Sequence, residues 1–141
     1  MIAVDSNVLI DLIGNTPGAS QAAVDALRHA LSRGPVVACE VAVAEVVAGL
    51  GSSALIVDVM DDMGIDFSPL ELRAAVRAGE MQRRYRQRRV SPPGLGHPTR
   101  TIPDFLIGAH ALLQCQALIT RDGGFFRDYF KGLKVIAPGA R

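Results

Sequence analysis

The chain opens with MIAVDSNVLIDL (residues 1–12), in which an apolar run ends at an aspartate and apolar residues resume after two small polar ones. The run IAV (2–4) predicts a short buried strand, and VLIDLI (8–13) predicts a first helix. Asp5 stands between them, where it either caps the helix or forms part of a functional site. The first dozen residues fit both roles equally well.

Short apolar runs alternate with helical patterns through the rest of the sequence. Strands are predicted at four more places: PVVAC (35–39), IDF (65–67), ALIT (117–120) and LKVIA (133–137). Helices are predicted over 21–33 with Ser20 as N-cap, over 40–50, from Ser52 or Ser53 to Gly64, from Ser68 and Pro69 through the arginine-rich segment, from Pro103 onward, and around FFRDYF (125–130). The helix over 40–50 is apolar almost all round, which predicts that it is largely buried. This alternation is typical of an α/β fold with a central parallel sheet and helices on both faces.

The size and composition fit one globular domain over residues 1–141, since 49% of the residues are hydrophobic and 21% are charged. No apolar run approaches the roughly 20 residues that span a bilayer, and the N-terminus lacks a signal-peptide pattern. Cys39 and Cys115 lie in apolar surroundings without metal-ligand spacing, as expected of free thiols in a reducing compartment. We therefore expect a cytoplasmic protein without a membrane segment.

Two acidic residues directly follow predicted strands. Asp5 comes after the strand over 2–4, and Asp122 lies just past the strand over 117–120. Functional sites of open parallel sheets form outside the carboxyl ends of the strands. Asp5 and Asp122 are therefore predicted at the same edge of the sheet.

Two more acidic residues occupy notable positions on predicted helices. Asp104 lies in the first turn of its helix, where the helix dipole alone would favour an aspartate. Glu45 is surrounded in sequence by alanines and valines, and a buried carboxylate without a partner is costly. A solvent-exposed stripe explains Glu45 less well, because its helix has few other polar residues.

Gathered at one site, these four carboxylates have no lysine or arginine expected among them, so they would repel one another and shift their own pKa values. A divalent cation removes the repulsion, and all-oxygen ligands suit Mg²⁺ or Mn²⁺ better than zinc. Ions held by carboxylates activate water and stabilise the charge that develops on a phosphoryl group. The residues thus predict metal-dependent phosphodiester hydrolysis.

Four stretches resemble the signature of the PIN-domain family: VDSNVLIDL around Asp5, EVVAGL around Glu45, IPDFLIGAHA around Asp104 and LITRDGGFFRDYF around Asp122. The likeness covers essentially the whole chain, and within the family the chain is similar to VapC-type ribonuclease toxins of bacterial type II toxin–antitoxin modules. The resemblance implies a single PIN-like domain in which the four acids are catalytic. It also implies that they bind one or two Mg²⁺ or Mn²⁺ ions and hydrolyse RNA.

The resemblance further implies supporting residues and partners. Ser6 and Asn7 stand where family members carry a small hydroxyl residue or asparagine, and Thr120 stands at a hydroxyl position before the fourth acid. VapC-type toxins are usually homodimers that a small VapB-like antitoxin neutralises by wrapping an apolar groove. The helices over 40–50 and 53–63 are candidates for lining that groove, and a role in the core alone fits them as well.

A basic segment, RRYRQRR (83–89), stands out in a chain whose net charge is only +1. Its arginines predict contacts with RNA phosphates, and Tyr85 is available to stack on a base. The members of this set are Arg83, Arg84, Arg86, Arg88 and Arg89. A solvated end of a long helix is the alternative. The three histidines, His29, His97 and His110, lack metal-type partners in the sequence and are expected to be ordinary surface or core residues.

The sequence lacks residues that two other classes of protein need. A phosphatase of the haloacid dehalogenase type needs a second aspartate two residues after the first, and Asn7 occupies that position. A receiver-type signalling domain needs a lysine late in the fold, but Lys131 and Lys134 come after the fourth acid. A non-toxin PIN-domain nuclease in RNA processing and a non-catalytic RNA-binding PIN module stay open as alternatives.

Overall fold

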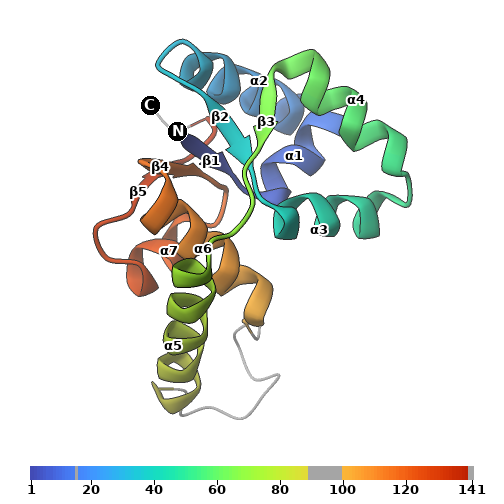
Figure 1. The fold of residues 1–141 in the computed structure, drawn as a ribbon. Helices are drawn as coiled ribbons and strands as arrows, with labels where there is room; N and C mark the ends of the chain where they lie inside the picture. The colour runs from blue at the N-terminus through green and yellow to red at the C-terminus, as the bar shows by residue number, and fades with distance from the viewer. Residues whose placement is uncertain (15, 89–99, 140–141) are drawn as a thin grey trace.

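Five short parallel strands form the centre of the protein, whose computed structural model describes residues 1–14, 16–88 and 100–139. The strands are β1 (Ile2–Val4), β2 (Val36–Ala38), β3 (Ile65–Phe67), β4 (Ala117–Ile119) and β5 (Lys134–Ile136). They lie in the order β3-β2-β1-β4-β5, and each neighbouring pair is parallel (Figure 1). β1, β2 and β4 are buried along their whole length, as their apolar sequences require.

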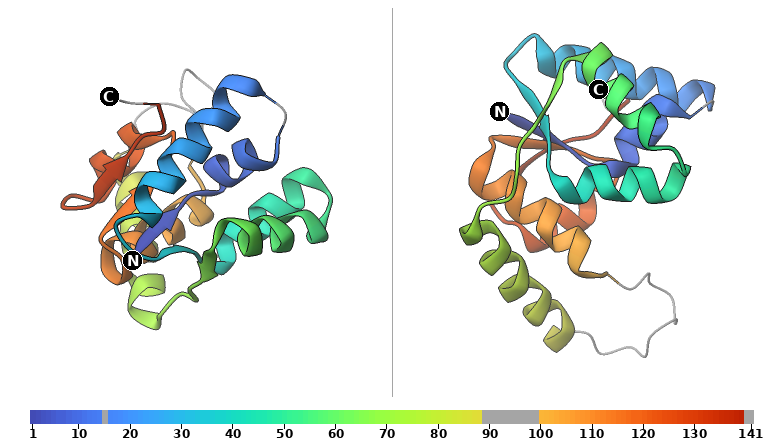
Figure 2. Two further views of the ribbon diagram at one scale, coloured as in Figure 1. Left: turned by 90° about the horizontal axis from the view of Figure 1, so that it is seen from above. Right: turned by 45° about the vertical axis from the view of Figure 1, so that its right-hand side comes forward.

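Helices cover both faces of this sheet. They are α1 (Ser6–Ile13), α2 (Pro17–Leu31), α3 (Glu40–Leu50), α4 (Ser53–Met63), α5 (Leu72–Arg88), α6 (Ile102–Gln114) and α7 (Gly123–Tyr129). α2 lies on one face and contacts β2, whereas α6 lies on the other face and contacts β1 and β4 (Figures 1 and 2). The predicted fold class is therefore confirmed. No helix in the described part of the chain is long and apolar enough to cross a membrane.

The chain reverses its direction across the sheet between β1 and β4. From β1 it proceeds to β2 and then to β3 at one edge, after which it crosses back and enters β4 on the other side of β1. In open α/β sheets, ligands bind outside the carboxyl ends of the strands at such a reversal. Asp5 follows β1 and Thr120 follows β4, so both residues stand at this position.

Helix α5 begins at Leu72, so the prediction that Ser68 and Pro69 open it is wrong. The Ser68 amide donates to the carbonyl oxygen of Ala38 at 2.9 Å, which continues the pairing of β3 with β2. The Ser68 hydroxyl lies 3.1 Å from Nε2 of His110, and both side chains are buried. Burial lowers the pKa of His110, so this residue is a neutral core histidine, in line with its expected ordinary role.

Helix α2 also begins at a different residue from the predicted one, at Pro17 instead of residue 21. Proline is favoured in the first helical turn because it lacks an N–H that would otherwise have no partner within the helix. Ser20 lies inside the helix, and its amide donates to the carbonyl oxygen of Thr16 at 2.9 Å. The signal at Thr16 and Pro17 therefore outweighs the capping signal of Ser20.

Helix α3 is less buried than its apolar sequence predicts, because only Ala42 and Val46 are fully enclosed. Val41, Ala44 and Ala48 form one wall of a surface groove against α6. The residues that line this groove are Glu40, Val41, Ala44, Glu45, Ala48, Pro103 and Leu106. α4 does not contribute to the lining. The prediction of a largely buried helix over 40–50 is thus wrong, and the unburied apolar surface lies directly beside Glu45.

A close approach between α6 and the end of α7 fixes the two helices that carry Asp104 and Asp122. Gly108 in α6 faces the ring of Phe130, and a Cβ atom at this position would lie 2.3 Å from Cε2 of that ring. The ring also packs against the rings of Phe105, 6.3 Å between centroids, and Phe126, at 6.1 Å. Only glycine leaves room for this packing.

Candidate acidic site

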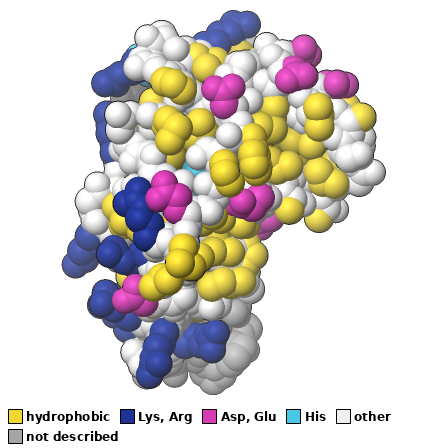
Figure 3. Space-filling model, in the orientation of Figure 1, with side chains coloured by type: hydrophobic (Ala, Val, Ile, Leu, Met, Phe, Trp, Pro, Cys, Tyr) yellow, Lys and Arg dark blue, Asp and Glu magenta, His cyan; other side chains and the backbone are white. Residues whose placement is uncertain are grey.

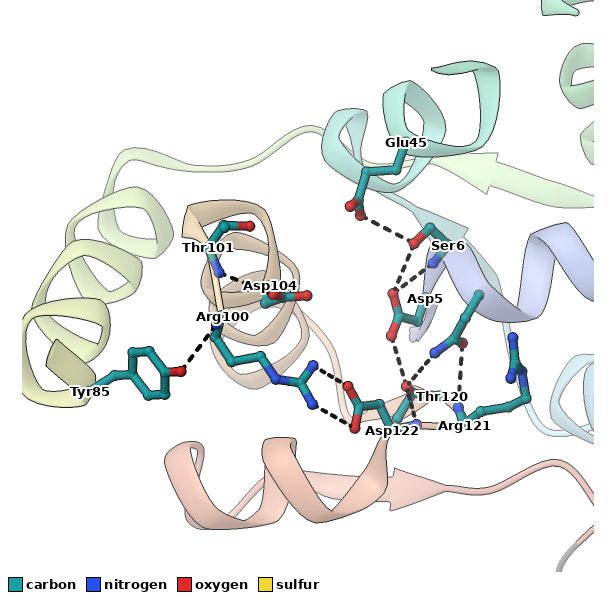
Figure 4. Close-up of polar contacts among 11 residues, drawn as sticks. Asp5, Ser6, Glu45, Tyr85, Arg100, Thr101, Asp104, Thr120, Arg121 and Asp122 are labelled. Carbon is teal, nitrogen blue, oxygen red and sulfur yellow. Dashed lines mark hydrogen bonds and ion pairs between the residues drawn. The ribbon is translucent and has the colours of Figure 1, made fainter. Parts of the chain in front are cut away.

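Asp5 is buried where β1 meets α1, and each of its carboxylate oxygens has a different partner. Oδ1 accepts the amide N–H of Ser6 at 2.7 Å, so Asp5 does cap α1. Oδ2 accepts the hydroxyl of Thr120, the residue that follows β4, at 2.7 Å (Figure 4). The cap accounts for one oxygen only, and the second oxygen links Asp5 to the end of the neighbouring strand.

Thr120 has a hydroxyl whose hydrogen-bonding capacity is fully used. It donates to Asp5 and accepts from the amide of Asp122 at 3.0 Å and from Nδ2 of Asn7 at 3.4 Å. A hydroxyl has one proton and two lone pairs, so its proton is directed at Asp5. The side-chain oxygen of Asn7 in turn accepts from the amide of Arg121 at 3.3 Å. Asn7 and Thr120 therefore tie the start of α1 to the end of β4.

Glu45 reaches the same edge of the sheet from the middle of α3. Its Oε1 lies 3.1 Å from Oγ of Ser6, and this Oγ is 3.4 Å from Oδ1 of Asp5. One hydroxyl proton serves one carboxylate at a time, so Ser6 is a donor shared between the two acids. Glu45 is half-buried, neither in the apolar core nor on a fully solvated stripe.

Asp104 approaches from the first turn of α6, and its carboxylate points from the helix toward Asp5 (Figure 4). Its Oδ2 accepts the amide N–H of Thr101 at 3.3 Å, which is the contact expected of an acidic residue at a helix start. Asp104 is half-buried. The helix-capping interpretation and the site interpretation therefore both describe this residue.

The electrostatics show that these three acids act on one another. Burial raises the pKa of Asp5 to about 6, because the charged form loses its hydration. The hydrogen bond from Thr120 opposes this rise in pKa, and the negative charges of Glu45 and Asp104 add to it. Burial also raises the pKa values of Glu45 and Asp104, and the charge of Asp104 raises the pKa of Glu45 further. Three carboxylates from three different elements thus share one region of negative potential.

Asp122 differs from the other acids because it has a cationic partner. Both of its oxygens are bound by the guanidinium of Arg100, through Nη1 to Oδ2 and through Nη2 to Oδ1, the latter at 3.1 Å. The expectation of an acidic site without an arginine is therefore wrong. The sequence carries little sign of this contact, because Arg100 is only one of several arginines before α6.

The donor set suits a hard divalent cation, since it consists of carboxylate and hydroxyl oxygens. Asp5, Glu45 and Asp104 have raised pKa values, so a cation would relieve the cost of their ionised forms. Within the described residues, no three His, Cys, Asp or Glu side chains are already arranged to hold an ion. The carboxylates would have to draw together around a metal.

Four of the five arginines of the basic segment lie on α5. Arg83, Arg84, Arg86 and Arg88 are exposed, and Arg89 and His97 lie outside the described residues. Tyr85 is not available to stack on a base, because its ring packs 5.6 Å from that of Phe105 and 5.5 Å from that of Tyr129. Its hydroxyl accepts the amide N–H of Arg100 at 3.1 Å, so the predicted stacking role of Tyr85 is wrong.

Comparisons with known proteins give the same picture of the fold. The family model described as PIN domain matches residues 2–131. A VapBC complex from Rickettsia felis bound to promoter DNA aligns with a TM-score of 0.74 and 15% identity over 97% of this chain and 98% of that one. A VapBC complex from nontypeable Haemophilus influenzae aligns with a TM-score of 0.69 and 19% identity over 99% and 100% of the two chains.

A third similar structure is a sarcin-ricin-loop-cleaving VapC toxin from Mycobacterium tuberculosis. It aligns with a TM-score of 0.62 and 15% identity over 95% of this chain and 99% of that one. No curated protein matches the chain by sequence. Identities this low establish a shared fold, and the family match extends over nearly the whole sequence. The chain belongs to the PIN-domain family.

Proposed function

We propose that this protein is a divalent-metal-dependent endoribonuclease and the toxic component of a type II toxin–antitoxin system. The observation that carries the proposal is the meeting of Asp5, Glu45 and Asp104 at the carboxyl end of β1, from three separate elements. Three carboxylates with raised pKa values are costly unless a cation or a proton neutralises them. Membership of the PIN-domain family and the likeness to solved VapBC structures support the assignment.

The metal would be held by Asp5, Glu45 and Asp104, and Asp122 is the fourth acid of the site, paired with Arg100 on the β4 side. Mg²⁺ or Mn²⁺ fits an all-oxygen ligand set of this kind. When bound, such an ion supplies positive charge to the phosphate and promotes ionisation of a water.

The remaining residues of the site orient the carboxylates. Thr120 fixes the rotamer of Asp5 through its hydroxyl, and Ser6 spans the gap between Asp5 and Glu45. Asn7 holds the first turn of α1 against the residues that follow β4. The residues that make these contacts are not carboxylates. They can therefore keep the metal ligands in place while the charge at the site changes.

The proposed partners are an RNA substrate, a VapB-like antitoxin and a second copy of the chain. The similar structures include VapBC complexes and a toxin–antitoxin complex from Klebsiella pneumoniae. The groove between α3 and α6 is the surface we assign to the antitoxin, because it is apolar and adjoins Glu45. A toxin of this kind would act in the cytoplasm, where its RNA substrate is found.

The direct test is cleavage of RNA by the purified protein. Protein prepared without an antitoxin is incubated with total RNA and Mg²⁺ or Mn²⁺, and the products are separated on a denaturing gel. We expect discrete products that disappear with EDTA and with Asp5→Asn. Asp62→Asn is the matched control, because Asp62 is exposed on α4 and lies outside the site.

Each outcome of this test separates the proposal from its alternatives. Equal cleavage by Asp5→Asn and the wild type would contradict the acidic mechanism. RNA binding without any metal-dependent cleavage would indicate a non-catalytic RNA-binding module. Cleavage with no growth arrest on expression, and no rescue by a neighbouring small gene, would indicate a PIN nuclease of RNA processing instead of a toxin.

A further inference from the structure

Arg100 is held at the edge of the acidic site by three kinds of contact. Its guanidinium binds both oxygens of Asp122, and its Cζ lies 4.4 Å from the centroid of the Phe125 ring. Its backbone amide donates to the hydroxyl of Tyr85 at 3.1 Å. Figure 4 shows the side chain extended between α6 and the turn that follows β4. An arginine restrained at both its backbone and its guanidinium is fixed in position before any ligand arrives.

The guanidinium keeps donors for a further ligand while it is bound to Asp122. Arginine has five N–H groups, and the end-on pairing with a carboxylate uses two of them. Among the residues that the structure describes, Asp122 is the one acceptor that hydrogen-bonds this guanidinium. The side chain of Arg100 is 21% exposed, so an anion from solvent can reach it.

Asp122 differs from the other three acids in having its own cationic partner, although its charge still raises the pKa of Asp104 and the charge of Arg100 lowers it. Arg100 already neutralises it, and both of its oxygens are in use. Asp5, Glu45 and Asp104 have no such ion pair among the described residues. The site therefore has two parts, an acidic part that needs a cation and an Arg100–Asp122 pair that already contains one.

We propose that Arg100 binds the RNA phosphodiester and that Asp122 positions Arg100 for this role instead of binding the metal. The inference rests on the nuclease function proposed above. The side of the guanidinium that Asp122 leaves free has an Nε–H and an outer Nη–H, which match two oxygens of a phosphate. Asp122 and Phe125 hold the guanidinium in place, and the N–H groups that Asp122 does not use are the donors for the phosphate.

The first experiment measures RNA binding without catalysis. A fluorescein-labelled single-stranded RNA of mixed sequence is titrated with protein in EDTA, by fluorescence anisotropy at several NaCl concentrations. Arg100→Gln is expected to weaken binding about tenfold or more, and to reduce the slope of log K against log salt by about 0.7, the value for one phosphate contact with a single strand. Arg100→Lys should recover the salt slope but only part of the affinity, since it keeps the charge and loses the planar guanidinium. Arg33→Gln is the control, because Arg33 is exposed after α2 and carries the same charge.

The second experiment measures metal binding without RNA. Mn²⁺ is titrated into the protein and the free ion is followed by electron paramagnetic resonance. Asp5→Asn is expected to abolish binding. Asp122→Asn is expected to leave the Mn²⁺ affinity close to that of the wild type, while it weakens RNA binding as Arg100→Gln does. Circular dichroism of each variant checks that the fold is retained.

The two proposals fail in different ways. If Asp122→Asn loses Mn²⁺ as completely as Asp5→Asn, then Asp122 is a metal ligand and the positioning role is wrong. If Arg100→Gln binds RNA with the affinity and salt slope of the wild type, the phosphate role is wrong while the nuclease function stands. If the wild type shows no Mn²⁺ binding and no metal-dependent cleavage, the nuclease function itself is wrong and the phosphate role falls with it.

Discussion

Thr120 donates its hydroxyl proton to Asp5 at 2.7 Å across the boundary between β4 and β1, although the two residues lie 115 positions apart in the chain. The bond is buried, with Thr120 fully enclosed and Asp5 only 6% exposed. It opposes the rise that burial causes in the pKa of Asp5. Thr120, which follows β4, therefore favours the charged form of Asp5, which follows β1.

Replacing Thr120 tests this effect on Asp5. Thr120→Val keeps the shape of the side chain but removes the donor, so the pKa of Asp5 should rise above its value of about 6 and a proton should compete more strongly with the metal. We expect Mn²⁺ binding near pH 6.5 to weaken about tenfold or more, as for other residues that orient a metal ligand. Thr120→Ser keeps the hydroxyl and should bind nearly as well as the wild type. Equal Mn²⁺ affinities for the valine and serine variants, measured by isothermal titration calorimetry, would rule out this role.

The pH dependence of stability tests the burial of Asp5. Its pKa is raised from 3.8 to about 6 on folding, so its contribution to the free energy of unfolding is fully present below pH 4 and is lost as the pH rises through 6. Asp5→Asn cannot ionise and should lack this loss, which is on the order of 3 kcal/mol. The stability of the variant relative to the metal-free wild type should therefore be greater at pH 7 than at pH 4.5.

The same measurement has an internal control. Added Mg²⁺ or Mn²⁺ binds the ionised carboxylates, so it should raise the stability of the wild type near pH 7 and have little effect on Asp5→Asn. Urea denaturation at the two pH values, with and without metal, gives all four comparisons. Parallel stability profiles for the wild type and the variant would mean that the carboxylate is ionised as easily as in the unfolded chain.

Two glycines on helices offer a matched test of packing. Gly108→Ala places a Cβ 2.3 Å from the ring of Phe130 and should destabilise the protein by about 1–3 kcal/mol through overpacking. Gly79→Ala lies in α5 with nothing within 4 Å of the new Cβ, so it should stabilise the helix by up to about 1 kcal/mol. Thermal unfolding measures both changes, and a shift of the same sign in the two variants would contradict the packing described here.

The arginines of α5 are predicted to contact RNA. Two of them lie four residues apart on the same side of the helix. Arg84 and Arg88 line a depression with Lys131, and Cζ of Arg88 lies 6.0 Å from the centroid of the Tyr129 ring. Basic side chains gather over α5 in Figure 3. Replacing Arg84 and Arg88 together by Gln should lower RNA affinity and reduce the salt slope by about 1.4, the value for two phosphate contacts.

A double variant at the end of α2 is the control for this loss of RNA affinity. Arg28 and Arg33 are exposed at the end of α2, and changing both to Gln removes the same charge from another surface. An equal loss of affinity in this double variant would show that α5 acts only through net charge. Anisotropy titrations of one labelled RNA at several salt concentrations separate the two outcomes.

Much of the fold could be predicted because each strand is a short apolar run that ends at a polar residue. β1 and β4 show this pattern, and the topology then places Asp5 and Thr120 side by side. The start of α5 could not be predicted from local signals. Ser68 has the sequence of a helix cap, but its amide pairs with Ala38 and its hydroxyl with His110, both distant in sequence. At Ser68, these tertiary contacts satisfy the amide and the hydroxyl that a helix cap would otherwise use. They decide the local conformation in place of the capping motif.

The site shows the same division between local and distant information. The acids could be found because each is unusual among its own neighbours in sequence. The partner of Asp122 could not, because Arg100 lies 22 residues away and sequence alone does not show which arginine faces a carboxylate. The stacking prediction for Tyr85 is wrong for a related reason, since an aromatic residue among arginines fits either base stacking or packing in the aromatic cluster around Phe105.

The long separation of β1 and β4 along the chain affects when the acidic site can form during synthesis. Asp5 is made 115 residues before its partner Thr120, which directly follows β4. A nascent chain therefore has no complete acidic site until β4 has left the ribosome and paired with β1. A ribosome that stalls before residue 117 therefore releases a fragment in which Asp5 lacks both the neighbouring strand and the hydroxyl of Thr120.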